Sequence, residues 1–294
     1  MSSFRTLWYG PGVDQFAELW PPTAPATGPV PVVVLVHGGY WRQRYGLDLM
    51  HPLAADLSGR GYAVWNLEYR RIDGAGGWPA TFLDIVSGID RLADLAGAGL
   101  GVDLDRVAVV GHSAGGQLAL WAGARRRPGR PDTPRYAGPD AHVARALTEP
   151  PRVVAGYVVS LAGVCDLVEA ARQGLSGRAA CRLLEGTAEQ VPDRYRLACP
   201  TLLLPLRVPQ LVVHGTADAD VPLGLSAGYA AAAAAAGDPC EFRALPGVDH
   251  FALIDPASEA WAMVAGRLAA WRNGDLDAAG DGPREDPQDA SRST

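Results

Sequence analysis

The sequence has few of the features that mark several common classes of protein. Its 294 residues include only four cysteines (Cys165, Cys181, Cys199 and Cys240), and no two of them form a C-x-x-C pair. This spacing predicts free thiols in a reducing compartment rather than a disulfide framework. No H-E-x-x-H pattern occurs, and no two of the six histidines lie four residues apart around a carboxylate on a helix. We therefore predict no metal site and no cofactor.

Charge and hydropathy exclude further classes. The net charge of −6 offers no basic face for nucleic acid and no electrostatic attraction to an anionic membrane. The apolar runs have the length of strands, except for the alanines at 230–236, which suit a helix and are too short to span a bilayer. Residues 1–5 contain no apolar leader. We expect a cytoplasmic protein that acts on a small molecule, either as a monomer or as a homodimer.

The most informative segment is VAVVGHSAGG at residues 107–116. A β-branched apolar stretch runs directly into a G-x-S-x-G pattern, and a helix-like apolar stretch follows at 118–122. A nucleophilic serine must project from a sharp strand-to-helix turn, and glycines two residues before and after it relieve the crowding of that turn. We therefore predict that Ser113 is a nucleophile and that the N-terminus of the next helix faces a developing oxyanion.

A second apolar strand ends in a pair of glycines. Residues 32–41 read VVVLVHGGYW, and glycines in the loop after such a strand let the backbone approach a substrate closely. In the fold class that carries a G-x-S-x-G elbow, this loop supplies another N–H group to the oxyanion. The segment therefore predicts the second half of an oxyanion hole.

Two later segments supply an acid and a base. Asp218 and Asp220 lie in the turn after an apolar strand, and His250 lies in a loop just before the last predicted helix. The chain order serine, aspartate, histidine is that of the α/β-hydrolases. His250 would take the proton from Ser113, and the carboxylate would hold the imidazole in one tautomer. We favour Asp218 because it comes first after the strand, where it is fixed best, and Asp220 is the alternative.

Strands and helix-like segments alternate along the chain. This order predicts an α/β protein with a mostly parallel central sheet and helices on both faces, in a single domain over residues 1–272. Residues 16–20 predict an early edge strand. Residues 125–152, rich in Arg, Pro and Gly, predict a long surface loop, and 166–200 predict a helical excursion able to roof the site as a small cap. Residues 273–294 lack periodicity and predict a disordered tail.

Several motifs together resemble those of a known family. The box HGGYW at 37–41, the elbow GHSAGG at 111–116 and the triplet DHF at 249–251 resemble the kynurenine formamidases (arylformamidases) and related bacterial serine esterases of the α/β-hydrolase superfamily. The resemblance covers about residues 7–272 and includes WYG at 8–10 and LAGVCDL at 161–167. The turn GTADADVP at 215–222 is more similar to that of general esterases.

The resemblance implies an α/β-hydrolase fold and a set of site residues. The oxyanion hole would consist of the N–H groups of Gly39 and Tyr40, with that of Ala114 after the nucleophile. Because the rings of Tyr40 and Trp41 directly follow the oxyanion loop, they offer flat faces to an aryl group of the substrate. For Trp41 we favour core packing over this contact.

The substrate that the resemblance favours is an aryl formamide such as N-formyl-kynurenine. The alternative enzyme is a carboxylesterase or acetylesterase that acts on small esters. We favour a peptidase less, because no size-selecting domain accompanies the motifs. A non-catalytic binding protein of the same fold is also less favoured, because such proteins typically lose the serine or the histidine.

Overall fold

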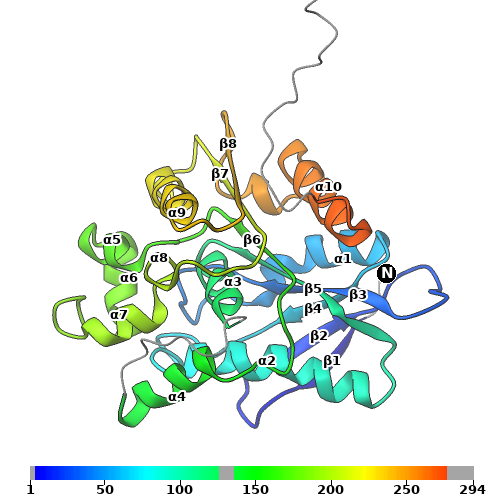
Figure 1. Cartoon of the computed structure of the whole chain (residues 1–294), viewed down its shortest axis with the longest axis horizontal. Coiled ribbons are helices and arrows are strands. Elements are labelled where there is room, and N and C mark those ends of the chain that lie inside the picture. Colours follow the sequence, from blue (N-terminus) through cyan, green and yellow to red (C-terminus); the bar gives the residue numbers. More distant parts are fainter. Residues whose placement is uncertain (1–3, 126–135, 277–294) are drawn as a thin grey trace, which may run out of the picture.

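An eight-stranded sheet runs through the part of the chain that the computed structural model describes, residues 4–125 and 136–276 (Figure 1). The strand order is β1-β2-β4-β3-β5-β6-β7-β8. β1 and β2 pair antiparallel with their neighbours, and all the later pairs are parallel. This is the predicted α/β-hydrolase sheet. The strands are β1 (Arg5–Trp8), β2 (Phe16–Trp20), β3 (Val30–Val36), β4 (Ala63–Leu67), β5 (Val102–His112), β6 (Tyr157–Leu161), β7 (Gln210–Gly215) and β8 (Cys240–Leu245).

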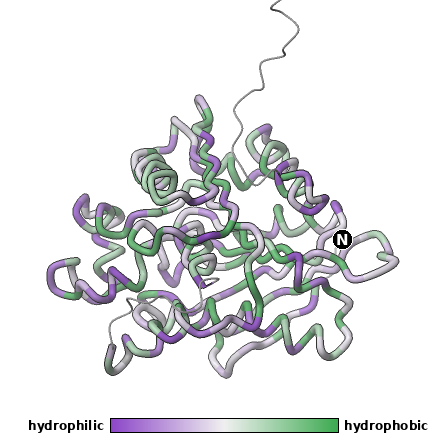
Figure 2. Tube along the Cα trace, viewed as in Figure 1, coloured by the Kyte–Doolittle hydropathy of each residue, from purple (hydrophilic) through white to green (hydrophobic). Residues whose placement is uncertain are grey.

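The central strands are apolar because both of their faces are covered. In β3 the side chains alternate between two cores: Val32, Val34 and Val36 join one of them, and Val33 and Leu35 join the other. A strand buried on both faces reads as an unbroken apolar run, as the sequence does here. The hydropathy-coloured trace is accordingly green along these strands (Figure 2).

Helices cover both faces of the sheet. Residues of α1 (His51–Gly59) and α10 (Glu259–Asn273) belong to one core, and those of α2 (Ala80–Gly97), α3 (Ala114–Ala124) and α9 (Leu223–Ala235) belong to the other. In Figure 1 α1 and α10 lie together on one side of the strands, and α2 lies on the opposite side. Two short 3-10 helices, η1 (Leu47–Met50) and η2 (Ala252–Ile254), lie before α1 and α10. None of the helices in the described residues is long and apolar enough to cross a membrane.

Two sequence predictions need correction. Residues 16–20 form a strand but not an edge, because β1 pairs outside β2 in the register Arg5↔Leu19. The predicted loop at 125–152 contains a helix, α4 (Gly138–Thr148), whose Val143 and Leu147 are buried one helical turn apart. Residues 126–135 of that prediction lie outside the described residues, as does most of the predicted tail (277–294).

The excursion between β6 and β7 is helical, as predicted. It contains α5 (Leu167–Arg172), α6 (Leu175–Leu184), α7 (Pro192–Ala198) and α8 (Pro200–Leu203). Arg42, next to the glycine box, donates a hydrogen bond to the carbonyl of Ser176 in this excursion. The helices therefore lie against the loop that follows β3, and their role as a cap stays a prediction.

Register brings the motif-bearing loops to one edge of the sheet. At the carboxyl ends of the parallel strands, Val36 pairs with Gly111, and His112 pairs with Leu161, which in turn pairs with Val213. In open α/β sheets ligands bind beyond these ends. The glycine box, the serine elbow and the aspartate turn all leave the sheet at this edge.

Candidate active site

The elbow around Ser113 has the strained geometry that its glycines predict. Ser113 has φ 55° and ψ −118°, a conformation rare for a residue with a side chain. A Cβ on Gly111 would lie 1.9 Å from the carbonyl oxygen of Gly115, and one on Gly115 would lie 2.0 Å from that of Val36. Backbone atoms cannot yield to such contacts, so both positions require glycine. The Ser113 N–H donates to the carbonyl of Leu161 at 2.8 Å, which ties the elbow to β6.

The structure brings Asp218 to His250. Oδ2 of Asp218 lies 2.6 Å from Nδ1 of His250, and Oδ1 accepts the backbone N–H groups of Asp220 and Val221, each at 2.8 Å. The Asp220 carboxylate is exposed and has no hydrogen bond to His250. Of the two candidate acids, Asp218 is therefore the one that holds the imidazole.

Hydrogen bonds keep Asp218 ionised. Burial alone would raise the pKa of this carboxyl, but hydrogen bonds from His214 and His250 outweigh it and lower the pKa below the usual range. Asp218, Asp220 and His250 also place three potential metal ligands within 4.8 Å of one another. Because Asp218 and His250 already bond to each other, the arrangement fits proton transfer better than metal binding.

His112 ties the loop of His250 to the elbow. Nε2 of His112 lies 2.9 Å from the carbonyl oxygen of His250, and the two rings have centroids 4.5 Å apart. A carbonyl only accepts, so this Nε2 carries the hydrogen. Burial lowers the pKa of His112 to about 3, so the ring is neutral at pH 7. Since His112 directly precedes Ser113, this bond ties the backbone of the His250 loop to the elbow.

Within the described residues, the His250 ring has its hydrogen bond to Asp218, and none joins it to Ser113 Oγ. Contacts between a nucleophile and its base are often long in an enzyme without substrate and tighten when substrate binds. The structure thus joins Asp218 to His250 and brings the His250 loop to the elbow. The transfer of a proton from Ser113 to His250 stays a proposal.

The glycine box reaches the elbow by close backbone approach. A Cβ on Gly38 would lie 2.9 Å from both the carbonyl oxygen of His112 and Cβ of Ser113. The next three residues, Gly39, Tyr40 and Trp41, have φ of 101°, 50° and 56°, three left-handed conformations in a row. The N–H groups of Gly39, Tyr40 and Ala114 donate to no other described residue, which leaves them free for the predicted oxyanion.

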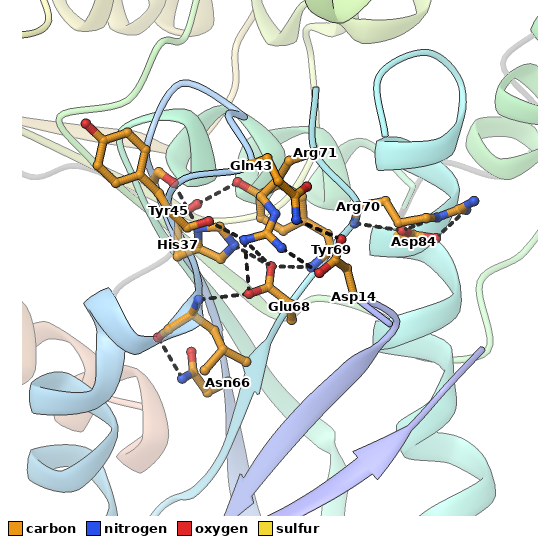
Figure 3. A network of polar contacts seen from close by, with 12 residues as sticks. Asp14, His37, Gln43, Tyr45, Asn66, Glu68, Tyr69, Arg70, Arg71 and Asp84 are labelled. Carbon is orange, nitrogen blue, oxygen red and sulfur yellow. Dashed lines mark hydrogen bonds and ion pairs between the residues drawn. The ribbon is translucent and has the colours of Figure 1, made fainter. Parts of the chain in front are cut away.

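A buried polar network holds the box in this conformation (Figure 3). Nε2 of His37 lies 2.9 Å from Oε1 of Glu68, and the His37 ring stacks on that of Tyr69 with centroids 4.4 Å apart. The Tyr69 hydroxyl donates to the carbonyl of His37 at 3.0 Å. Three contacts therefore hold His37, the residue at which the strained loop begins.

The network continues through Glu68 to buried charges. Oε2 of Glu68 accepts the N–H of Leu47 at 3.0 Å and lies 3.3 Å from Arg71, whose guanidinium reaches Asp14 at 2.7 Å. Burial would raise the pKa of Glu68, but the neighbouring His37 and Arg71 lower it overall. The residues predicted from the sequence do not include Glu68, Arg71 and Asp14, although charges directly after the buried strand β4 (LEYRR, 67–71) were a usable signal.

The two predicted aromatic contacts differ. Trp41 is 0% exposed, packs in the core and donates to Oε1 of Gln117 at 3.2 Å. This burial agrees with core packing, the favoured interpretation of Trp41, and speaks against a substrate contact.

Tyr40 is half-buried, and its hydroxyl donates to the carbonyl of Asp220 at 2.6 Å, which bridges the box and the aspartate turn. Burial raises the pKa of Tyr40 to about 12, so the phenol keeps its proton. Phe251, 56% exposed, is a second ring beside the site and packs edge-on against His250. These two rings, one predicted and one missed, flank the assembled loops.

A family model described as BD-FAE matches residues 19–232, well over half of the chain. The chain belongs to the BD-FAE family. Among curated proteins it resembles Esterase LipC of Mycobacterium tuberculosis, with 25% identity over 259 residues. The match covers 86% of this chain and 61% of LipC, so the chain spans less than two thirds of that relative.

Solved structures show the same fold at low identity. A truncated carbohydrate esterase from gut microbiota superimposes with a TM-score of 0.75 and 20% identity, over 92% of this BD-FAE chain and 97% of the other. Esterase B from Lactobacillus rhamnosis, solved with a tributyrin phosphonate inhibitor, superimposes with a TM-score of 0.73 and 19% identity. This match covers 92% of the present chain and 86% of the other. These likenesses establish the α/β-hydrolase fold. The relatives bear esterase names, and the resemblance to arylformamidases is not confirmed.

Proposed function

We propose that this BD-FAE chain is a serine carboxylesterase that cleaves small acyl esters through an acyl-enzyme. The observation that carries the proposal is the hydrogen bond between Asp218 and His250, in a loop that His112 fastens to the strained Ser113 elbow. An acid–imidazole pair beside a serine on a strand-to-helix turn is the constellation of serine acyl transfer.

The reaction follows from the placement of these groups. His250 takes the proton from Ser113 as Oγ attacks the ester carbonyl carbon, and Asp218 stabilises the imidazolium that forms. The carbonyl oxygen becomes an oxyanion that accepts the N–H groups of Ala114 and of Gly39 or Tyr40. The tetrahedral intermediate collapses as His250 returns the proton to the leaving alcohol. Water, activated by His250, then releases the acid and restores Ser113.

Burial of the machinery favours short acyl groups. Ser113 is only 2% exposed, and the side chains of Asp218 and His250 are also buried. A deeply set nucleophile accepts a small acyl group more readily than a bulky one. The relative solved with a C4 tributyrin phosphonate points the same way, toward esters of small acids.

A fluorophosphonate probe and a substrate panel test the proposal. The probe should label Ser113 in the intact protein, and Ser113→Ala should abolish labelling. The panel compares p-nitrophenyl acetate, butyrate and octanoate with N-formyl-kynurenine at equal enzyme concentration. We expect kcat/KM for the best short ester at or above ~10⁴ M⁻¹s⁻¹, the low end for an enzyme acting on its own substrate. A folded protein that neither labels nor hydrolyses any ester would reject the proposal in favour of a binding protein.

The second candidate is hydrolysis of an aryl formamide such as N-formyl-kynurenine. The flat ring of Tyr40 at the oxyanion box and the exposed ring of Phe251 beside His250 favour it, because each offers a face to an aryl leaving group. Tyr40→Ala should then raise KM more for the formamide than for p-nitrophenyl acetate. Turnover of esters without detectable formamide cleavage would reject this candidate and leave the carboxylesterase standing.

Two further expectations stay predictions for this proposed enzyme. The four thiols are free, which fits a reducing compartment such as the cytoplasm. The protein is expected to be a monomer or a homodimer, and light scattering distinguishes the two by their mass.

A further inference from the structure

A second histidine contacts the carboxylate of Asp218. His214, 0% exposed at the end of β7, places Nε2 3.2 Å from Oδ2 of Asp218 and 2.9 Å from the carbonyl oxygen of Val221. Its Nδ1 lies 2.7 Å from Oγ of Ser226 in α9. From the sequence alone, this residue is only the end of a buried strand.

The partners of His214 fix its tautomer. Carbonyl and carboxylate oxygens only accept, so Nε2 carries the hydrogen. It donates this hydrogen to the carbonyl of Val221, and Oδ2 of Asp218 lies 3.2 Å away as a second acceptor. Nδ1 lies within hydrogen-bond distance of the Ser226 hydroxyl, which can donate to it. Ser226 is itself buried, with Cys165 Sγ at 3.7 Å as its other neighbour.

We propose that His214 is a positioning residue that holds the Asp218 carboxylate in the orientation His250 needs. The backbone N–H groups that bind Oδ1 belong to the same turn as Asp218 and move with it. His214 instead belongs to β7, which pairs with strands on both sides. The contact with His214 therefore fixes the position of Oδ2 relative to the rigid sheet. Without its N–H, Oδ2 keeps only the bond to the imidazole, and the carboxylate gains freedom to rotate.

This role rests on the proposed esterase function, and substitution kinetics test it. His214→Leu removes the donor at similar size, whereas His214→Gln keeps a side-chain N–H at about the reach of Nε2. With p-nitrophenyl acetate we expect His214→Leu to lower kcat by roughly ten- to a hundredfold, by analogy with the loss of a hydrogen-bond partner that orients a metal ligand. KM should change less than about twofold, because substrate does not touch His214. His214→Gln should recover most of the loss.

A double-mutant cycle separates positioning from general structural damage. If His214 acts only through Asp218, the variant carrying both His214→Leu and Asp218→Asn should be no slower than Asp218→Asn alone. Rates that fall by the product of the two single effects would overturn the proposal. So would a folded His214→Gln that is as slow as His214→Leu.

A readout without turnover keeps the proposal testable if the variants do not fold or the esterase assignment fails. Nitrogen-15 spectra of histidine-labelled wild-type protein should show hydrogen on Nε2 for both His112 and His214, and Ser226→Ala should perturb only the His214 ring. A ring with hydrogen on Nδ1 alone would overturn the assignment. Wild-type protein that hydrolyses nothing but shows the expected ring would instead reject the proposed function and leave the contact in place.

Discussion

The two sides of the serine elbow are held by different chemistry. The oxyanion box relies on buried charges, with Glu68 and Arg71 linked on to Asp14. The acid–base side contains one deeply buried charge, Asp218, and is held by imidazoles such as His112, which is neutral. The box must keep three successive residues in left-handed conformations, and strong ionic ties suit a strained backbone. The acid–base side must stabilise a new positive charge on His250 during the reaction, and further fixed cations there would oppose that charge.

Loss of the shared serine should have the largest effect. Ser113→Ala should lower kcat by about 10⁴- to 10⁶-fold while the fold is kept, because both sides assist the attack that this hydroxyl makes. His250→Ala should be nearly as severe, and the double variant no worse than either single one. Ester hydrolysis and circular dichroism measure the two properties. More than about a hundredth of wild-type activity in a folded Ser113→Ala would contradict the assignment.

The acid–base side should respond sharply to one amide substitution. Asp218→Asn should lower kcat by about 10⁴-fold, the size of effect that the same substitution has in serine proteases, because the amide favours the wrong imidazole tautomer. Asp220→Asn is the matched control and should change kcat less than about threefold, since only its backbone contacts Tyr40 and Asp218. The reverse order of severity would move the acid to Asp220.

The oxyanion side should lose stability as well as rate. Glu68→Gln leaves Arg71 buried with one carboxylate partner fewer, and breaking such a buried pair costs about 3 kcal/mol in the free energy of unfolding. The exposed Glu189→Gln is the control, with an expected change within about 0.5 kcal/mol. Urea unfolding measures the free energy of unfolding of both variants. Equal stability of the two variants would show that the network does not hold the fold.

Acidification should loosen the two sides in sequence. The pKa of His112 is lowered to about 3 by burial, so the unfolded chain binds its proton first and stability falls as pH drops below about 6.5. The pKa of Glu68 is lowered too, so its contribution is present above the ordinary carboxyl pKa of about 4.3 and is lost only as pH falls further.

A His112→Gln variant isolates the first of these steps. The amide can still donate to the carbonyl of His250, but it does not titrate. Its free energy of unfolding should therefore fall less steeply than that of the wild type between pH 6.5 and about 5, by at most about 1.4 kcal/mol per pH unit. Parallel slopes for the two proteins would assign the acid sensitivity to other groups.

How much the sequence could predict depends on whether a feature is local. The elbow at Ser113 was predictable because its glycines, strand and helix lie within ten residues, and Asp218 because it directly follows a strand. The tie between Arg71 and Asp14 joins residues 57 positions apart, so no local pattern reveals it. For Trp41 both core packing and a substrate contact stayed open, because a strained turn gives no periodicity from which the direction of its side chain can be inferred.

The loop between β1 and β2 has a consequence for anyone who trims this protein. Asp14 lies in that loop, at the far side of the sheet order from the strands that lead to Asp218 and His250. A shortened chain starting at β2 would retain Ser113, Asp218 and His250, together with the elements that bear them. It would nevertheless lack the Asp14 carboxylate, which binds the guanidinium of Arg71 and the side-chain amide of Gln43. The amino-terminal hairpin is thus a poor place for truncation or library randomisation, and fusion partners are better joined elsewhere.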